Sequence, residues 1–478
     1  MVTSLSLPPF NYFFVNFFTF SLFFLFLIKK SDHHNNKKLF FYYGWLFGFG
    51  YFLSNLYWIS ISLTFDQNFK FLIPFTIFII PSFLALFYGL ITFFFIILKP
   101  KKSVHAFLVF SLVYGFLEFL RGSILTGFPW NLIAYSFAEN LEILNIISII
   151  GTYGFNLFCI SLFIAPALIV IKRNRLHIGI CVFFIILISI FHFFGLINQK
   201  KFNKLNVEKY EYKLRVIGSN ISLERFYNNK DPILFIEELI RISSSNKDEK
   251  IIFVWPEGIL PGIYQDELVK YNWLFKKHFN ENHFFIIGIN NKQSTNYRED
   301  YFNSLSIYNY KLDLLHSYNK NKLVPFGEFL PFEKTLKKIG LNSLTNNYQS
   351  YSFGQEREII DLKNQKFSLK ILPLICYEII YSGKLFKDPD FDVIVNISED
   401  GWFGQSIGPS QHFTHSIFRA IESGKYVLRS ANNGVAAIIN PLGIVEQKVS
   451  FGQTGYIDFK ENRKIQPRIF SKYGNKIF

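Results

Sequence analysis

The segment FSLKILPLICYEII, residues 367–380, sets the architecture expected for the C-terminal part of the chain. Residues 367–375 form a mostly apolar run with the length of a buried β-strand, and Cys376, Tyr377 and Glu378 follow it at once. Apolar strands of this kind need helices on the faces of their sheet, and functional sites form at strand carboxyl ends. The segment therefore predicts an α/β domain with a thiol at a strand end.

The same alternation of short apolar runs and helical stretches continues through the second half of the chain. Glu257 directly follows another apolar run, so a carboxylate and a thiol are both expected at strand ends. Residues 458–478 are interpreted as a polar tail. The expected strands are 212–219, 250–255, 283–290, 301–309, 367–375 and 392–398, with a hairpin over 435–449, and the expected helices are 232–242 and 410–429.

The first part of the chain has longer apolar blocks, in a sequence of 478 residues that is 50% hydrophobic. Blocks of about 20 apolar residues are long enough to cross a membrane. We therefore divide the chain into a transmembrane helical domain, 1–200, and a water-soluble domain, 201–478. Six spans are expected: 10–28, 39–62, 71–97, 105–121, 145–171 and 176–197.

The basic residues report how this protein is oriented in the membrane. Loops 29–38, 98–104 and 172–175 hold four, three and three Lys or Arg residues, whereas the alternate loops hold little more than Lys70 and Arg121. Positive loops face the cytoplasm, so the water-soluble domain is expected outside, on the periplasmic side of a bacterial inner membrane. The charge of +15 forms no dense basic stripe interleaved with aromatic residues, which argues against nucleic-acid binding.

Glu118 and Arg121 lie three residues apart at the end of one expected span and can share a helix face. One interpretation is an interfacial pair with Arg121 extended to the lipid headgroups. The other is a functional role at a lipid-facing entrance. The sequence leaves both open.

The three cysteines divide between packing and chemistry. Cys159 and Cys181 lie in apolar spans and are interpreted as packing residues. Cys376 is the only cysteine of the exported part, so it has no disulfide partner there. Because an unpaired thiol is a liability in an oxidising compartment, a functional role is favoured.

A thiol nucleophile needs a base and a group that stabilises the oxyanion. Glu257, in VWPEG, is the candidate base, since Pro256 restricts the backbone before it. The segment YNKNKLVPFGE, residues 318–328, offers Lys320, Lys322 and Glu328. A lysine of this segment is a candidate donor to the developing oxyanion.

Three motifs stand in order along the chain: WPE at 255–257, YNKNKLVPFGE at 318–328 and CYE at 376–378. This order of Glu, Lys and Cys resembles the nitrilase, or carbon–nitrogen hydrolase, superfamily. GFPWNLIAYS at 127–136, GWFGQSIGPSQH at 401–412 and RSANNG at 429–434 extend the match over nearly the whole chain. With them, the sequence resembles the bacterial apolipoprotein N-acyltransferase family.

The resemblance implies an α-β-β-α sandwich carried on a transmembrane bundle, working as a monomer without cofactor or metal. It implies ping-pong transfer of an acyl chain from a phospholipid, usually phosphatidylethanolamine, through a cysteine thioester. The acceptor is the α-amine of the S-diacylglyceryl cysteine that begins an apolipoprotein.

The family's roles are carried over onto the matching residues of this chain. Glu328 and Glu378 are expected to hold the lysine and shape the pocket, with loop salt bridges as the alternative. Trp402 and the Tyr377 ring are expected as pocket walls, with ordinary aromatic core as the alternative. The roles in the reaction are nucleophile for Cys376, general base for Glu257, and oxyanion donor for Lys320, preferred over Lys322, with the backbone N–H of Tyr377.

The chain departs from the family pattern at several places. The family's first span is expected to be absent or to lie upstream of Met1, and its C-terminal span is expected to be missing. Glu399 replaces an amide, and Phe226 or Tyr227 replaces a Trp. Two rival functions stay open: a membrane-tethered amidase with the same triad, and a transporter or scaffold with a degenerate domain. The last predicts that Cys376→Ala leaves function intact.

Overall fold

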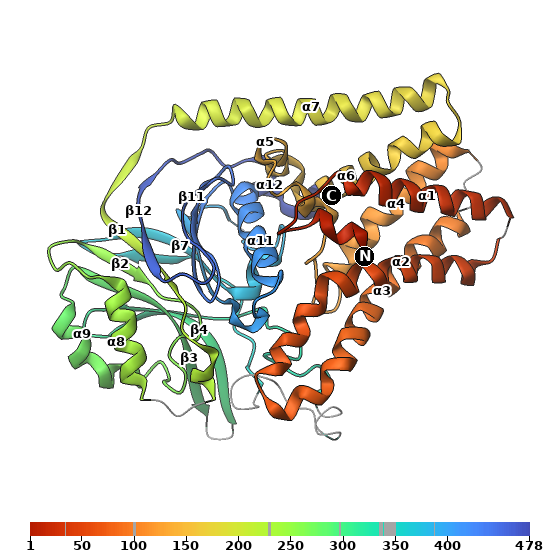
Figure 1. The fold of residues 1–478 in the computed structure, drawn as a ribbon. Helices are drawn as coiled ribbons and strands as arrows, with labels where there is room; N and C mark the ends of the chain where they lie inside the picture. Colours follow the sequence, from red (N-terminus) through yellow and green to blue (C-terminus); the bar gives the residue numbers. More distant parts are fainter. Residues whose placement is uncertain are drawn as a thin grey trace.

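The structure is a computed structural model that describes residues 1–33, 35–98, 102–227, 231–295, 298–333, 338, 350–386 and 388–478. Figure 1 shows a helical bundle on one side and a sheet domain on the other. Helix α7 runs back from the far end of the bundle toward the sheets and leads into β1 (Figure 1). The two parts are in contact through α11, which packs on α6.

The bundle follows from the apolar blocks of the sequence. Its helices pack through aromatic side chains; the rings of Phe17 and Phe163, from α1 and α6, meet edge to face. The helices are α1 (Val15–His33), α2 (Lys37–Leu56), α3 (Ile73–Ile97), α4 (Ser103–Arg121), α5 (Leu141–Leu144), α6 (Ile147–Ile171) and α7 (Arg175–Asn203).

Five helices of the described residues are long and apolar enough to cross a membrane: Lys37–Thr64, Gln67–Ile97, Ser103–Arg121, Ile147–Ile171 and Arg175–Asn203. The sequence predicted a sixth over residues 10–28. There the helix is α1, which begins at Val15 and continues to His33. It includes Lys29, Lys30 and Asp32, so its apolar part is shorter than the prediction required.

The sheet domain contains one continuous path of strands in the order β5-β4-β3-β2-β1-β9-β8-β7-β6. β1 joins β9 through only two residue pairs, Gly218 with Ala431 and Ser219 with Asn432. The strands are β1 (Glu208–Ser219), β2 (Ile251–Val254), β3 (His283–Thr295), β4 (Arg298–Asn309), β5 (Leu314–Asn319), β6 (Ile360–Lys363), β7 (Ser368–Ile375), β8 (Val393–Glu399), β9 (Tyr426–Asn432), β10 (Ala436–Ile439), β11 (Val445–Val449) and β12 (Gly455–Asn462).

The two halves of this path pack face to face, so the expected α-β-β-α sandwich is confirmed. One core lies between them, with Val216 and Ile252 from one half in the same cluster as Ile371 and Val395 from the other. Helices α8 (Pro232–Ser243) and α9 (Asn272–His278) cover the outer face of the first half. Helix α11 (Gly408–Ser423) covers the second half, where its apolar side chains join the core of the bundle.

Two expectations for the C-terminal region are wrong. The helix predicted over 410–429 ends at Ser423, because Gly424 takes a left-handed conformation (φ +67°) that terminates it. The apolar residues after it form β9, buried in the sheet. The supposed polar tail contributes β12, which pairs antiparallel with β1, and the short helix α12 (Ile469–Tyr473).

Candidate active site

The residues proposed from the sequence for catalysis lie just after strand ends. Glu257 follows β2, Lys320 follows β5, and Cys376 follows β7. β1, β2 and β3 run parallel, as do β7, β8 and β9, so their carboxyl ends meet where the two halves of the sheet join. Each of the three side chains is at most 8% exposed.

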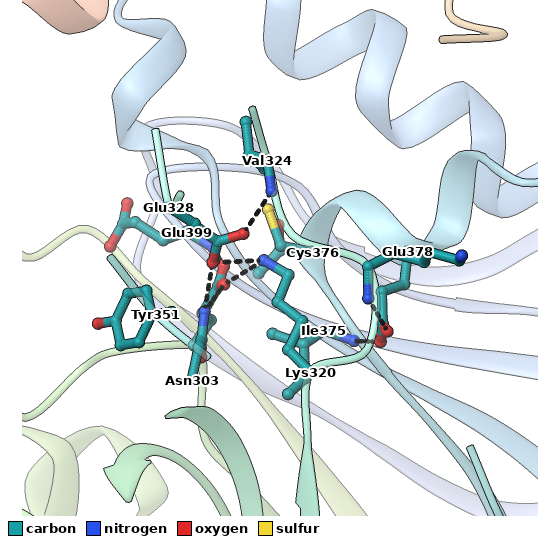
Figure 2. Close-up of polar contacts among 12 residues, drawn as sticks. Asn303, Lys320, Val324, Glu328, Tyr351, Ile375, Cys376, Glu378 and Glu399 are labelled. Atoms are coloured by element: carbon teal, nitrogen blue, oxygen red, sulfur yellow. Dashed lines mark hydrogen bonds and ion pairs between the residues drawn. The ribbon is translucent and has the colours of Figure 1, made fainter. Parts of the chain in front are cut away.

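Lys320 forms the centre of a buried ionic cluster. Its Nζ donates to Oε1 of Glu257 at 3.1 Å and to Oε1 of Glu328 at 2.8 Å. Burial disfavours the ammonium ion, but the two carboxylates outweigh burial and hold the pKa of Lys320 well above its ordinary value. Lys322, the alternative lysine, is exposed. The structure thus places Lys320, and not Lys322, between the two glutamates, and Figure 2 shows its ammonium group beside Glu328.

Asn303, on β4, is a member of this cluster that sequence reasoning missed. Its Nδ2 donates to Oε1 of Glu257 at 2.7 Å and to Oε1 of Glu328 at 2.8 Å (Figure 2). Its backbone carbonyl accepts from the N–H of Lys320 at 2.8 Å. The only signal in the sequence was a polar residue inside an expected strand, and such residues are common on exposed strand faces.

The second oxygen of Glu257 is held by the end of β8. Oε2 accepts the backbone N–H of Glu399 at 2.9 Å. The side chain of Glu399, at the position where the resemblance predicts an amide, pairs with buried Arg225 at 2.5 Å. Burial raises the pKa of the Glu399 carboxyl group, and Arg225 opposes that rise. The buried carboxylate of Glu399 is therefore neutralised by the guanidinium of Arg225.

Cys376 begins the short 3-10 helix η7 (Cys376–Ile380) with a φ of +46°. Few residues other than glycine adopt this left-handed conformation, so the surrounding contacts must maintain it. Burial, and after it the nearby Glu257 carboxylate, raise the pKa of the thiol, while Lys320 opposes them. A thiol in this environment is protonated near neutral pH and becomes a nucleophile when a base removes its proton.

His412, for which the sequence showed no link to Cys376, lies beside the nucleophile's backbone. Its Nε2 is 3.3 Å from the carbonyl oxygen of Cys376, and its Nδ1 is 2.9 Å from Oδ1 of Asp400. Arg429 pairs with the same aspartate at 2.8 Å. Burial and Arg429 lower the pKa of His412. The imidazole contacts the carbonyl group of Cys376 and so supports the turn, whereas the charge of the Glu257 carboxylate acts on the pKa of the thiol.

Glu378 lies in a different environment from Glu328. It forms an ion pair with Arg357 at 2.8 Å, and it accepts the hydroxyl of Tyr318 at 2.6 Å. It also accepts the backbone N–H groups of Ile375, Asn321 and Lys322, which lie beside Cys376 and Lys320 in the chain (Figure 2). Glu328 therefore contacts the Lys320 ammonium directly, whereas Glu378 joins the two backbone segments that bear Cys376 and Lys320.

The two aromatic candidates contact the membrane-side segments. The hydroxyl of Tyr377 donates to the carbonyl of Gly127, in the loop after α4, at 3.0 Å. Trp402 is half-buried between the rings of Phe65 and Phe226, at centroid distances of 5.9 and 5.4 Å. Both side chains thus lie between the sheet domain and loops of the bundle.

The Glu118–Arg121 pair is buried within the chain. Arg121 is 2% exposed and pairs with Glu118 at 2.5 Å. Its guanidinium also donates to the carbonyl of Phe128. This residue lies in the same loop as Gly127, whose carbonyl accepts the hydroxyl of Tyr377. The interpretation that Arg121 extends to the lipid headgroups is therefore wrong, because its charge is satisfied inside the protein.

Comparison with known proteins agrees with this geometry. Residues 235–460 match the family model described as carbon-nitrogen hydrolase, and residues 1–165 match the one described as apolipoprotein N-acyltransferase N-terminal domain. The sheet domain is thus a carbon–nitrogen hydrolase domain attached to a membrane bundle. Among solved structures, a mutant of the amidase from Nesterenkonia sp. AN1 is similar over 54% of this chain and 92% of its own, at 10% identity and a TM-score of 0.36.

Curated relatives extend the match across both parts. The apolipoprotein N-acyltransferase of Rickettsia prowazekii is 31% identical over 91% of this chain and 86% of its own length. That of Rhizobium leguminosarum bv. trifolii is 30% identical over 96% and 88%, and that of Brucella suis is 29% identical over 87% and 78%. The chain belongs to the apolipoprotein N-acyltransferase family.

Proposed function

We propose that this protein transfers an acyl chain from a phospholipid to the α-amine of the diacylglyceryl cysteine that begins an apolipoprotein. The observation that carries the proposal is the buried cluster in which Lys320 joins Glu257 and Glu328 beside the thiol of Cys376. This cluster combines a nucleophile, a base and a fixed cation, which acyl transfer through a thioester requires.

In the first half-reaction Glu257 takes the thiol proton as Sγ of Cys376 attacks the ester carbonyl of the phospholipid. The carbonyl oxygen gains negative charge and receives hydrogen bonds from the Lys320 ammonium and from the N–H of Tyr377. The tetrahedral intermediate collapses by breaking the ester C–O bond. Glu257 returns its proton to the leaving alkoxide, so a lysophospholipid departs and a thioester remains on Cys376.

In the second half-reaction the α-amine of the apolipoprotein attacks the thioester carbonyl. Glu257 accepts a proton from the attacking nitrogen, and the same two donors stabilise the second oxyanion. The C–S bond then breaks, an amide forms, and the thiolate of Cys376 takes the proton back. No redox step is involved, and the enzyme returns to its starting state.

We also propose that residues 1–200 anchor the protein in the inner membrane and that residues 201–478 act on the periplasmic side, as a monomer with phosphatidylethanolamine as donor. Positive-inside topology supports this orientation. The basic turns between α1 and α2 and between α6 and α7 lie at the end of the bundle farther from the sheets (Figure 1). One copy of the chain supplies Glu257, Lys320 and Glu328, so the proposed monomer already holds the cluster.

The test uses the full chain in lipid nanodiscs containing phosphatidylethanolamine, followed by intact mass measurement. The proposal expects a mass gain of one acyl chain that hydroxylamine removes and that Cys376→Ala lacks. Glu257→Gln should block the adduct while the protein stays folded. No adduct, with activity retained in Cys376→Ala, would refute the proposal and favour a scaffold or transporter.

An amidase that uses the same residues would pass the acyl chain to water. Adding a diacylglyceryl lipopeptide to the isolated thioester separates the two functions. The proposal expects the acyl chain on the peptide's α-amine. Release of free fatty acid at the same rate, with or without the peptide, would favour the amidase.

A further inference from the structure

A second buried polar cluster lies where the sheet domain meets the bundle. It consists of Thr152 on α6, Arg419 and Glu422 on α11, and Ser382, which follows the η7 turn. These side chains are at most 3% exposed. We refer to them as the Arg419 cluster; none of them belongs to the proposed reaction centre.

On the bundle side, the cluster occupies a break in helix α6. Gly151 has non-helical dihedral angles (φ 70°, ψ 173°), and a Cβ atom there would lie 2.0 Å from the ring of Phe470. A new helical segment starts after the break, and the first N–H groups of such a segment lack partners within the helix. Oε1 of Glu422 accepts the Thr152 N–H at 2.8 Å and its hydroxyl at 2.6 Å. A carboxylate of the sheet domain thus caps a membrane helix.

On the other side, the cluster is bonded to the turn that bears the nucleophile. Nη1 of Arg419 donates to the carbonyl of Ile380, the last residue of η7, at 3.0 Å, and Nη2 donates to the Thr152 hydroxyl at 2.7 Å. The hydroxyl of Ser382 donates to Oε1 of Glu422 at 2.6 Å. Nε of Arg419 lies 2.9 Å from Oε2 of Glu422, which completes an ion pair.

We propose that the Arg419 cluster positions Cys376 by fixing the far end of its turn to helix α6. The inference rests on the proposed role of Cys376 as nucleophile. The thiol stands at one end of a five-residue turn in a left-handed conformation, and contacts at the other end limit how that turn can relax. Thr152, Arg419 and Glu422 are positioning residues, because they contact the turn and the helix rather than the reacting atoms.

The test is Thr152→Val, which removes the hydroxyl and keeps the side-chain shape and the backbone N–H. Thr152→Ser retains the hydroxyl and serves as the conservative variant. Thr19→Val is the matched control in another helix of the bundle, since the Thr19 hydroxyl donates to the Val15 carbonyl of its own helix. The full chain is assayed in nanodiscs at varied phosphatidylethanolamine content, and thioester formation is followed by intact mass.

Thr152→Val should lower the maximal rate of thioester formation about tenfold and leave the half-saturating lipid content unchanged. Thr152→Ser and Thr19→Val should both react like the wild type. A Thr152→Val rate within about twofold of wild type would overturn the inference. So would an equal loss in Thr19→Val, which would indicate a general effect on the bundle.

The two proposals fail in distinguishable ways. If the wild type forms no Cys376-dependent adduct, the proposed function fails; if it does and Thr152→Val reacts equally fast, only the positioning role fails. If Thr152→Val does not fold, Ser382→Ala is the alternative variant. It removes the hydrogen bond that the Ser382 hydroxyl, just after the η7 turn, donates to the Glu422 carboxylate. It should show the same loss in maximal rate, and a rate equal to wild type would again overturn the inference.

Discussion

Replacing Asn303 with alanine tests the assembly of the buried cluster most directly. The Asn303 amide donates to one carboxylate oxygen of Glu257 and one of Glu328, at 2.7 and 2.8 Å. Without it, Lys320 is the remaining side-chain donor shared by these two carboxylates in the described part of the chain. Glu257 then loses one of the contacts that orient it toward the thiol.

The expected loss of stability and of rate in Asn303→Ala follows from these two hydrogen bonds. A hydrogen bond to a charged group contributes about 1.5–3 kcal/mol, so loss of both should lower the free energy of unfolding by about 3 kcal/mol or more. If the contact holds Glu257 in the orientation that only the transition state needs, its loss alone slows thioester formation by about 10- to 100-fold. The lipid dependence should not change, because Asn303 contacts the base and not the substrate.

Asn303→Asp sharpens the test because it keeps the shape of the side chain and adds a carboxyl group. Two carboxylates about 3 Å apart repel by roughly 5 kcal/mol at an effective dielectric constant of about 20, which raises the pKa of the new group. Below that pKa the neutral acid donates one hydrogen bond; above it the third carboxylate repels the others. The rate of Asn303→Asp should therefore fall further as the pH rises, relative to Asn303→Ala.

The assay is quenched-flow thioester formation in nanodiscs, read by intact mass across neutral pH, with denaturant melts for stability. Asn309→Ala is the matched control on the same strand, since its amide donates to Asp313 in the exposed turn that follows β4. It should leave the rate unchanged. An Asn303→Ala rate equal to wild type, or identical pH profiles for the alanine and aspartate variants, would refute the reasoning.

Three further predictions concern the nucleophile's turn. Because burial and Glu257 raise the pKa of Cys376, its alkylation by iodoacetamide, followed by peptide mapping, should be slow near neutral pH and accelerate at alkaline pH. Glu257→Gln should shift that acceleration to lower pH; an unshifted profile would contradict it. Glu378→Gln leaves buried Arg357 without its charged partner and should lower the free energy of unfolding by about 3–5 kcal/mol in denaturant melts. A near-zero change would disprove the pairing. Tyr377→Phe loses one interdomain hydrogen bond and should cost about 1 kcal/mol in the same melts, while a stability equal to wild type would show that bond to be unimportant.

Much of the architecture could be predicted because it depends on local patterns. Apolar runs and the polar residues that end them placed Glu257 and Cys376 at strand ends, since strand periodicity is encoded within a few residues. Prediction failed where a helix and a strand are separated by a turn of only two residues, Gly424 and Lys425. The residues after Ser423 were assigned to a helix, but Gly424 ends that helix and the following apolar segment joins the sheet as β9.

The site could be predicted only as a set of residue types. The motifs indicated Lys320 over Lys322 as the oxyanion donor, and that role stays a prediction; in the structure Lys320 lies between two carboxylates and Lys322 is exposed. Asn303 had no distinguishing motif, since its importance comes from the register that places β4 beside Lys320. The pairing of Glu399 with Arg225 was equally hidden, because the two residues lie far apart in the chain.

The amino-acid order alone specified the five membrane-length helices, most of the sandwich strands and a glutamate, a lysine and a cysteine available for one reaction. These features depend on hydrophobicity, periodicity and residue type, which are local properties. Tertiary structure alone decided that Glu328 contacts Lys320 whereas Glu378, two residues from Cys376, pairs with Arg357. It also decided that helix α6 is tied to the nucleophile's turn through Arg419. A buried polar group takes its partners from whatever packing brings beside it, and here those partners come from distant parts of the chain.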